Sequence, residues 1–134
     1  MKLNQLIEKE SIARVHLLGK VSQEELIALY TLAEIFVATA PKEDFGLTPA
    51  EALSCGTPVV AWNDGAGPSE IVLDQKNGLL ARPYDIKDMA ENVKEILNNK
   101  FKIKKHKEII SSAQRFSEKI IGKQLLDEVR RVLQ

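Results

Sequence analysis

Residues 39–62, TAPKEDFGLTPAEALSCGTPVVAW, decide the fold because they join two short apolar runs through a loop and a helix. The runs, residues 35–38 and 57–62, have the length and composition of buried strands. Between them, Thr48-Pro49-Ala50-Glu51 combines a threonine cap, a proline at the first helical position and a glutamate at the third. Gly56 is typical of the residue at which a helix ends. The stretch therefore predicts strand, loop, helix and strand, in that order.

Upstream of this stretch, residues 15–18 predict another buried strand, in which His16 would be a satisfied core residue. Ser22 and Glu25 form a capping box, in which each side chain binds a free backbone N–H of the other residue. A helix should follow as far as residue 33. Its expected buried residues are Leu26, Leu29, Tyr30 and Ala33.

Downstream, Ser69 is expected to cap a short helix, and Asn77-Gly78 turns the chain into a strand over residues 79–81. Asp85, with Asp88 as its capping-box partner, opens an amphipathic helix. Alternating short strands and helices indicate an α/β fold with a parallel sheet covered by helices on both faces. The remaining predicted helices span residues 3–9, 103–114 and 117–133.

The length of 134 residues predicts one domain over residues 1–134, with an α/β core at 12–98 and a helical tail at 99–134. The 19 basic and 19 acidic residues cancel, so the whole chain shows no electrostatic preference for nucleic acid. The charges are segregated, however: residues 1–93 carry a net −6 and residues 94–134 a net +6. A single cysteine and the lack of a long apolar run favour a cytoplasmic protein.

The segment from Ala40 to Thr48 should lie where ligands bind in open parallel sheets, outside the carboxyl ends of the strands. Gly46 allows the backbone to approach a ligand closely. The helix that begins at Thr48 directs free N–H groups and a partial positive charge toward the same space. Such a helix end favours a phosphate by roughly 0.3–2 kcal/mol, which assists binding without supplying it alone.

Two carboxylates, Glu43 and Glu51, stand on either side of this predicted phosphate site. Carboxylates accept hydrogen bonds from hydroxyl groups, so the pattern fits a ligand with two polyol ends joined by phosphate. Other interpretations are available from the sequence. Glu51 is equally explained as the capping partner of Thr48, Glu43 beside Asp44 as a solvated loop charge, and Phe45 as a plug of the core.

The segment KEDFGLTPAEALSCGTPVVA, with its two glutamates separated by seven residues, resembles the signature of the family 4 retaining glycosyltransferases. The flanking segments LLGKVSQEEL and NGLLARPYDIKDMAENV are also similar to that family, so the resemblance covers about residues 12–98. It implies the GT-B architecture, in which two Rossmann-like domains face each other across a cleft. This chain would be part of the C-terminal, donor-binding domain.

The resemblance also implies roles for individual residues. Glu43 would be the catalytic-site residue that lies beside the donor sugar, and Glu51 would hold the nucleotide ribose. The reaction would move a hexosyl group from a nucleotide-diphospho-sugar to a glycan or lipid-linked acceptor, with no metal and no cofactor. The remaining donor-binding positions would be Phe45, Gly46, Leu47 and Thr48 through backbone N–H groups, and Gly19, Lys20 and Val21 at the base.

The sequence departs from the family in one respect that concerns the diphosphate. The family places a basic pair and an N-terminal acceptor domain ahead of the matched region, and residues 1–20 carry only scattered single basic residues. We therefore expect the chain alone not to transfer sugar. The alternatives are a non-catalytic module that completes a partner chain and a nucleotide-sugar epimerase of the same architecture. The lysines of residues 100–107 could contact an anionic membrane surface or form a solvated helix face.

Overall fold

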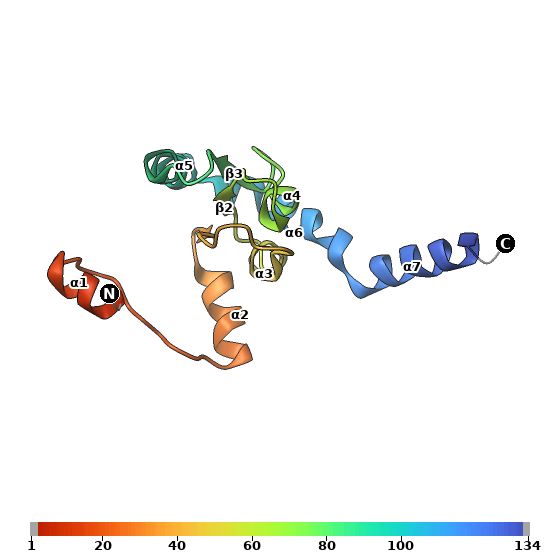
Figure 1. Ribbon diagram of the computed structural model, residues 1–134, viewed down its shortest axis with the longest axis horizontal. Coiled ribbons are helices and arrows are strands. Elements are labelled where there is room, and N and C mark those ends of the chain that lie inside the picture. The colour runs from red at the N-terminus through yellow and green to blue at the C-terminus, as the bar shows by residue number, and fades with distance from the viewer. Residues whose placement is uncertain (1–2, 133–134) are drawn as a thin grey trace.

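The computed structural model describes residues 3–132. A central body of helices and strands carries one arm at each end of the chain, as Figure 1 shows. The helices are α1 (Leu3–Lys9), α2 (Gln23–Leu32), α3 (Leu47–Ser54), α4 (Gly67–Ile71), α5 (Ile86–Asn98), α6 (Phe101–Ala113), the 3-10 helix η1 (Gln114–Phe116) and α7 (Glu118–Val132). The strands are β1 (Phe36–Val37), β2 (Val59–Trp62) and β3 (Gly78–Ala81).

The three strands form one parallel sheet in the order β1-β2-β3. Phe36 pairs with Val59, and Val59 pairs with Gly78. All four residues of the central strand β2 are buried, as expected for a strand with neighbours on both edges and helices on its faces. The α/β fold with a parallel sheet is confirmed. Because the strands are parallel, the loops that follow them all emerge at one edge of the sheet.

The core lies between the sheet and helices α3, α5 and α6. α3 packs on α6, and α5 packs on β2 and β3. The largest fully buried apolar side chains are those of Leu53, Ile96, Ile109, Val59 and Val60. This core fixes the position of α3, whose N-terminus lies at the carboxyl-end edge of the sheet.

Two helix starts follow the sequence signals. The Ser22 hydroxyl accepts the N–H of Glu25 at 3.2 Å, and the Glu25 carboxylate accepts the N–H of Ser22 at 2.7 Å, so the capping box of α2 is confirmed. Tyr30 is buried as predicted, whereas Leu29 is exposed. The Asp85 carboxylate caps α5, but Asp88 does not complete a capping box, because its carboxylate instead accepts the N–H and Nε–H of Arg82.

The predicted start of α3 is wrong by two positions. Gly46 occupies the cap position with a φ of 84°, so the helix begins at Leu47 and Thr48 lies inside it. No side chain caps this helix, and the Glu51 carboxylate bonds to Tyr30 of α2 instead of to Thr48. The left-handed conformation of Gly46 turns the chain into the helix earlier than a threonine cap would. Ser69 is likewise not a cap: Ala66 holds that position, and the Ser69 hydroxyl donates to its carbonyl.

The strand predicted at residues 15–18 does not form. Residues 11–20 are exposed and irregular, and they lead from α1 to α2 along the arm that leaves the body in Figure 1. His16 is therefore exposed, and its assignment to the core is wrong. A strand obtains its backbone hydrogen bonds from a neighbouring strand. The described residues provide none beside this segment.

The two C-terminal helices differ in how they contact the body. α6 packs against α3 and α5, whereas α7 packs on η1 and then runs outward, as the blue arm of Figure 1 shows. None of the residues of α7 is buried. The helix has the predicted position, and its predicted last residue, 133, lies outside the described residues. Nothing among the described helices is long and apolar enough to cross a membrane.

Candidate functional site

The loops that follow the three strands are tied together by one carboxylate, that of Asp64. Its Oδ2 accepts the backbone N–H of Lys42 at 3.0 Å and the hydroxyl of Tyr84 at 3.2 Å, and its Oδ1 accepts the N–H of Ala66 at 3.1 Å. These donors, with the Lys42 N–H first among them, hold the pKa of Asp64 below its ordinary value. The ionised carboxylate therefore fixes the loop after β1 against the loop after β2.

Asp64 was not among the residues singled out from the sequence. Its bond to the N–H two residues ahead is the turn typical of an aspartate followed by glycine, so Asp64-Gly65 was a readable local signal. The bonds to Lys42 and Tyr84 connect residues 22 and 20 positions apart. No local pattern indicates such contacts.

Gly67, the first residue of α4, lies directly against the loop that carries Glu43. The Gly67 N–H donates to the Glu43 carbonyl at 2.9 Å. A Cβ at position 67 would lie 2.3 Å from the carbonyl oxygen of Phe45. Only glycine fits there without displacing the backbone of the loop. Gly67 is therefore required by the close packing of α4 on the loop, and not only by a turn.

Gly46 brings the end of the same loop onto α4. Its φ of +84° is a conformation that side chains disfavour, and a Cβ there would lie 3.0 Å from Ile71 Cδ1. The neighbouring side chains of Phe45 and Leu47 point outward, with 61% and 62% of their surfaces exposed. Phe45 is therefore not a plug of the core. The loop presents its backbone, the free N–H groups of the first turn of α3 and two apolar side chains at the surface.

The two glutamates have different surroundings. Glu43 is half-buried, and its carboxylate forms no hydrogen bond or ion pair with the described residues. Glu51 Oε2 accepts the hydroxyl of Tyr30 at 3.2 Å. Burial of Tyr30, reinforced by the charge of Glu51, raises the pKa of the tyrosine to about 12. Glu51 is thus held by a tertiary contact, and Glu43 is left available for a ligand.

The predicted base-binding residues lie apart from these contacts. Gly19 and Lys20 are exposed and Val21 is partly exposed, in the segment just before α2. Within the described residues, none of them forms a hydrogen bond with the loops at the carboxyl ends of the strands. The structure therefore places Glu43, Phe45, Leu47 and Thr48 side by side at the surface around the buried Gly46, and it does not link residues 19–21 to them.

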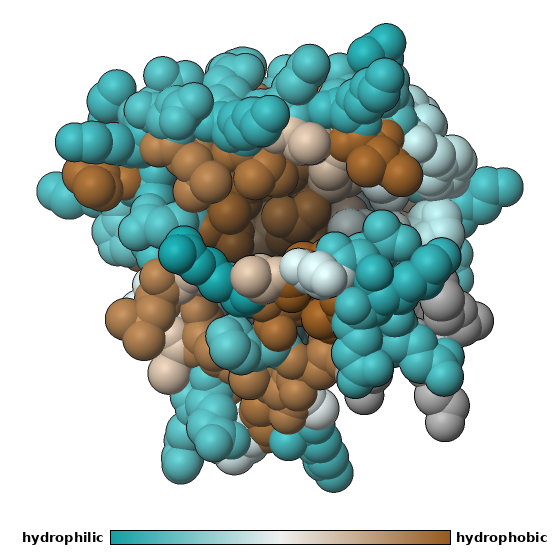
Figure 2. Space-filling view, turned by 90° about the vertical axis from the view of Figure 1, so that its left-hand side faces the viewer, coloured by the Kyte–Doolittle hydropathy of each residue, from teal (hydrophilic) through white to brown (hydrophobic). Residues whose placement is uncertain are grey.

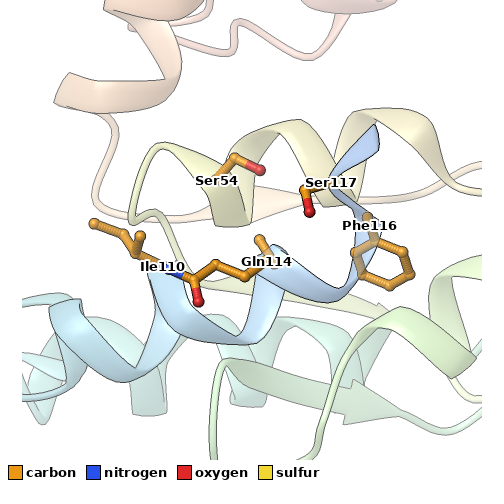
Figure 3. A pocket seen from close by; sticks show the side chains of 6 residues that line it. Ser54, Ile110, Gln114, Phe116 and Ser117 are labelled. Carbon is orange, nitrogen blue, oxygen red and sulfur yellow. The ribbon is translucent and has the colours of Figure 1, made fainter. Parts of the chain in front are cut away.

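Two of the hollows near α3 share Phe116 in their linings. One, of about 180 Å³, adjoins the loop of Glu43 and is lined by Asp44, Phe45, Gly67, Glu70, Ile71, Arg115 and Phe116. The other, of about 280 Å³, is lined by Ser54, Ile110, Ala113, Gln114, Phe116 and Ser117. Figure 3 shows Ser54 on α3 facing Ile110 and Gln114 across it. Since Ser54 is the last residue of α3, this second hollow lies away from the helix N-terminus and is not part of the candidate site.

Part of the lysine-rich segment is engaged with the body. Lys102 Nζ donates to the carbonyls of Thr31 and Ala33 at 2.6 Å, where α2 ends. Lys105 Nζ donates to the carbonyl of Gln75 and lies 5.1 Å from the ring centre of Phe101. These two lysines therefore have structural partners. In the part of the chain that the structure describes, no group of three His, Cys, Asp or Glu side chains could hold a metal ion.

The chain is similar in sequence to known glycosyltransferases. The chain is 30% identical over 131 residues to an uncharacterised glycosyltransferase of Methanocaldococcus jannaschii, which covers 98% of this chain and 36% of that protein. It is 38% identical over 85 residues to the D-inositol 3-phosphate glycosyltransferase of Mycolicibacterium smegmatis, covering 63% of this chain and 19% of the relative. The chain thus spans about a third or less of the length of these curated relatives.

Solved structures share the fold. Sucrose-phosphate synthase from Thermosynechococcus elongatus superposes with a TM-score of 0.85 at 28% identity, over 98% of this chain and 33% of the synthase. Anabaena Alr3699/HepE, solved in complex with UDP-glucose, gives 0.77 at 26% identity, over 96% of this chain and 36% of that protein. The fold is that of the Rossmann-like domains of GT-B glycosyltransferases. Because residues 1–116 match the family described as glycosyl transferases group 1, the chain belongs to that family.

Proposed function

We propose that the chain supplies the donor-binding part of a retaining glycosyltransferase of the cytoplasm. The enzyme would transfer a hexosyl group from a nucleotide-diphospho-sugar to a glycan or lipid-linked acceptor. The observation that carries this proposal is the surface formed by Glu43, Phe45, Gly46 and the start of α3, held in place by Asp64 and Gly67. It lies at the edge of a parallel sheet where ligands bind in such folds. The family match and the UDP-glucose complex of the Anabaena protein support it.

Each end of this surface would contact a different part of the donor. The Glu43 carboxylate, which has no partner among the described residues, would accept hydroxyls of the sugar. The backbone N–H groups of residues 45–48 would bind the sugar and the diphosphate at the N-terminus of α3. Glu51 would accept the ribose hydroxyls, and Gly19, Lys20 and Val21 would border the base.

The reaction would proceed mainly through positioning and electrostatic stabilisation. The bond from the sugar C1 to the diphosphate oxygen breaks as the bond from C1 to the acceptor oxygen forms on the same face. The proton of the acceptor hydroxyl passes to an oxygen of the leaving diphosphate. Glu43 would hold the sugar beside that diphosphate, so its role is to orient the reacting carbon.

The charges around the site indicate that these residues alone bind the diphosphate weakly. Glu43, Asp44 and Asp64 place negative charge near the loop, and the helix N-terminus contributes only roughly 0.3–2 kcal/mol toward an anion. Arg115 lines the adjoining hollow, but its guanidinium donates to the carbonyls of Glu70 and Ile71. Further basic groups would be needed to neutralise the diphosphate. We therefore expect weak donor binding and no sugar transfer by the chain alone.

The test compares the affinities of the chain for UDP-glucose and UDP, measured by NMR titration. If Glu43 binds the sugar, Glu43→Ala should weaken UDP-glucose roughly tenfold and leave UDP unchanged. Asp44→Ala, which removes an exposed carboxylate one position away, is the matched control and should change neither affinity. The donor of this chain need not carry the uracil base bound by the Anabaena protein. The same measurements are therefore made with GDP-mannose and GDP. Failure of all four probes to bind would overturn the proposal, and robust transfer by the chain alone would contradict its expected incompleteness.

The exposed face of α7 favours a second candidate, a module that completes a site with another domain or chain. The helix carries large apolar side chains that remain exposed: Ile120, Ile121, Leu125, Leu126, Val129 and Val132. Contiguous apolar surface of this kind marks interaction sites. In sedimentation experiments, we expect the chain to associate as concentration rises, and Leu125→Gln to weaken the association. Lys123→Gln, on the opposite face of α7, is the control, and a monomer at every concentration would count against self-association through this face.

A further inference from the structure

The Glu51 carboxylate lies on an exposed helix residue, where such a side chain ordinarily samples several rotamers. Here the Tyr30 hydroxyl donates to its Oε2 at 3.2 Å across the contact between α2 and α3. Oε1 has no partner among the described residues. A carboxylate offers about four lone-pair sites, so one contact to Tyr30 leaves enough acceptors for two hydroxyl groups.

The donor of this bond is itself anchored. Tyr30 is 7% exposed, and its ring meets the ring of Phe36 edge to face at 5.6 Å. Its carbonyl accepts the hydroxyl of Thr57 at the entry to β2. The next carbonyls of α2 are bound by Lys102 of α6. Contacts with the sheet and with α6 therefore hold Tyr30 in place, and its hydroxyl has a fixed position beside α3.

The protonation of Tyr30 suits this role. Burial, and then the neighbouring charge of Glu51, raise the pKa of the hydroxyl to about 12, so it remains a donor throughout the neutral range. An ionised Glu51 can only accept, so the bond has one direction. The bond to Tyr30 thus sets the orientation of the Glu51 carboxylate and leaves Oε1 able to accept other hydrogen bonds.

We propose that Tyr30 is a positioning residue that orients Glu51 to accept the two ribose hydroxyls of the donor nucleotide. This inference rests on the proposed function, and it assigns to α2 a part in nucleotide recognition beyond its place in the fold. Tyr30 does not touch the ligand in this account. Its removal should therefore reduce the contribution of the ribose hydroxyls and leave the contacts of the diphosphate intact.

The test is the ratio of affinities for UDP and for dideoxy-UDP, which lacks both ribose hydroxyls, measured by NMR titration. For the unaltered chain, we expect UDP to bind roughly tenfold more tightly than dideoxy-UDP. Tyr30→Phe keeps the ring and should lower this ratio to about two. Adding Glu51→Gln to Tyr30→Phe should change the ratio little further, because the two residues act through one contact. Thr31→Val removes an exposed hydroxyl of the same helix, one that bonds only to the Ile27 carbonyl within α2, and should preserve the ratio.

The outcomes separate the inference from the proposed function. A Tyr30→Phe chain that keeps the full ratio, while Glu51→Gln loses it, overturns the positioning role alone. Equal binding of UDP and dideoxy-UDP by the unaltered chain overturns the ribose role of Glu51 and this inference with it. Absence of UDP and GDP binding overturns the proposed function and the inference together. If Tyr30→Phe does not fold, Glu51→Asp withdraws the carboxylate from Tyr30, and an unchanged ratio in that variant overturns the positioning role.

Discussion

At the scale of single residues, Glu43 and Glu51 are chemically identical and structurally different. Glu51 was predicted to cap α3, yet the cap position belongs to Gly46, and the carboxylate binds Tyr30 instead. Glu43 has no side-chain partner among the described residues. Of the two, Glu51 has a structural role and Glu43 does not, which is why Glu43 is the stronger candidate for contact with the donor sugar.

This difference predicts the effect of each substitution on stability. Glu43→Ala should change the free energy of unfolding by no more than about 0.5 kcal/mol, because it removes no contact. Glu51→Ala should cost about 1 kcal/mol, because it leaves the hydroxyl of Tyr30 without its acceptor. Denaturant unfolding monitored by circular dichroism measures both values. A greater loss in Glu43→Ala than in Glu51→Ala would contradict these assignments.

The raised pKa of Tyr30 predicts a dependence of stability on alkaline pH. The folded chain favours the protonated hydroxyl, so the stabilisation is complete below the ordinary tyrosine pKa of about 10. It is then lost as the pH rises toward the folded value of about 12. The unfolding free energy should fall over this interval in the unaltered chain and fall less in Tyr30→Phe. The chain has two tyrosines, so the tyrosinate absorbance of Tyr30→Phe reports Tyr84 alone. An equal fall in unfolding free energy between about pH 10 and 12 in both chains would contradict the prediction.

At the scale of elements, the site depends on how closely α4 approaches the loop after β1. Gly67→Ala would place a Cβ 2.3 Å from the Phe45 carbonyl oxygen, so the loop must move. We expect a loss of about 1–3 kcal/mol in unfolding free energy and weaker UDP-glucose binding. Gly122→Ala, in open space on α7, is the matched control and should leave stability unchanged or slightly raised. Unaltered stability of Gly67→Ala in thermal unfolding would show that this approach is not required.

Local signals predicted the elements well where the deciding contacts are local. The Ser22–Glu25 capping box, the cap of α5 at Asp85 and the parallel order of short strands are confirmed. The start of α3 was misplaced because the conformation of Gly46 replaces a side-chain cap. The sequence contains no local trace of the contact between Tyr30 and Glu51, which are 21 positions apart.

The strand expected at residues 15–18 failed for a reason that belongs to the sheet. A buried strand and an unpaired apolar segment have the same composition, and only a neighbouring strand distinguishes them. Residues 11–20 have no such neighbour among the described residues, and they stay exposed. Residues 43–51 follow β1 at the carboxyl-end edge of the sheet, and their role as a site, like the grouping of residues 19–21 with them, remains a prediction.

At the scale of the whole molecule, the body is flanked by two arms with exposed apolar side chains. Figure 2 looks at the side of the molecule on which α1 and α5 lie in Figure 1, and it shows apolar side chains gathered around a hollow with a polar surround. The exposed apolar side chains of the N-terminal end of the chain include Leu3, Ile12, Val15, Leu17, Leu18, Ile27, Leu29 and Leu32. The exposed apolar stripe of α7 lies at the other end of the chain, so both arms expose large apolar side chains.

The most direct test of the account maps UDP-glucose onto the isotope-labelled chain by NMR. Donor binding at the start of α3 predicts that the backbone amides of Phe45, Gly46, Leu47 and Thr48 shift in a saturable way, together with that of Gly67 behind them. The amides of α7 should not move, because that helix projects away from the site. Shifts confined to other surfaces, or no shifts with either UDP-glucose or GDP-mannose, would contradict the central claim.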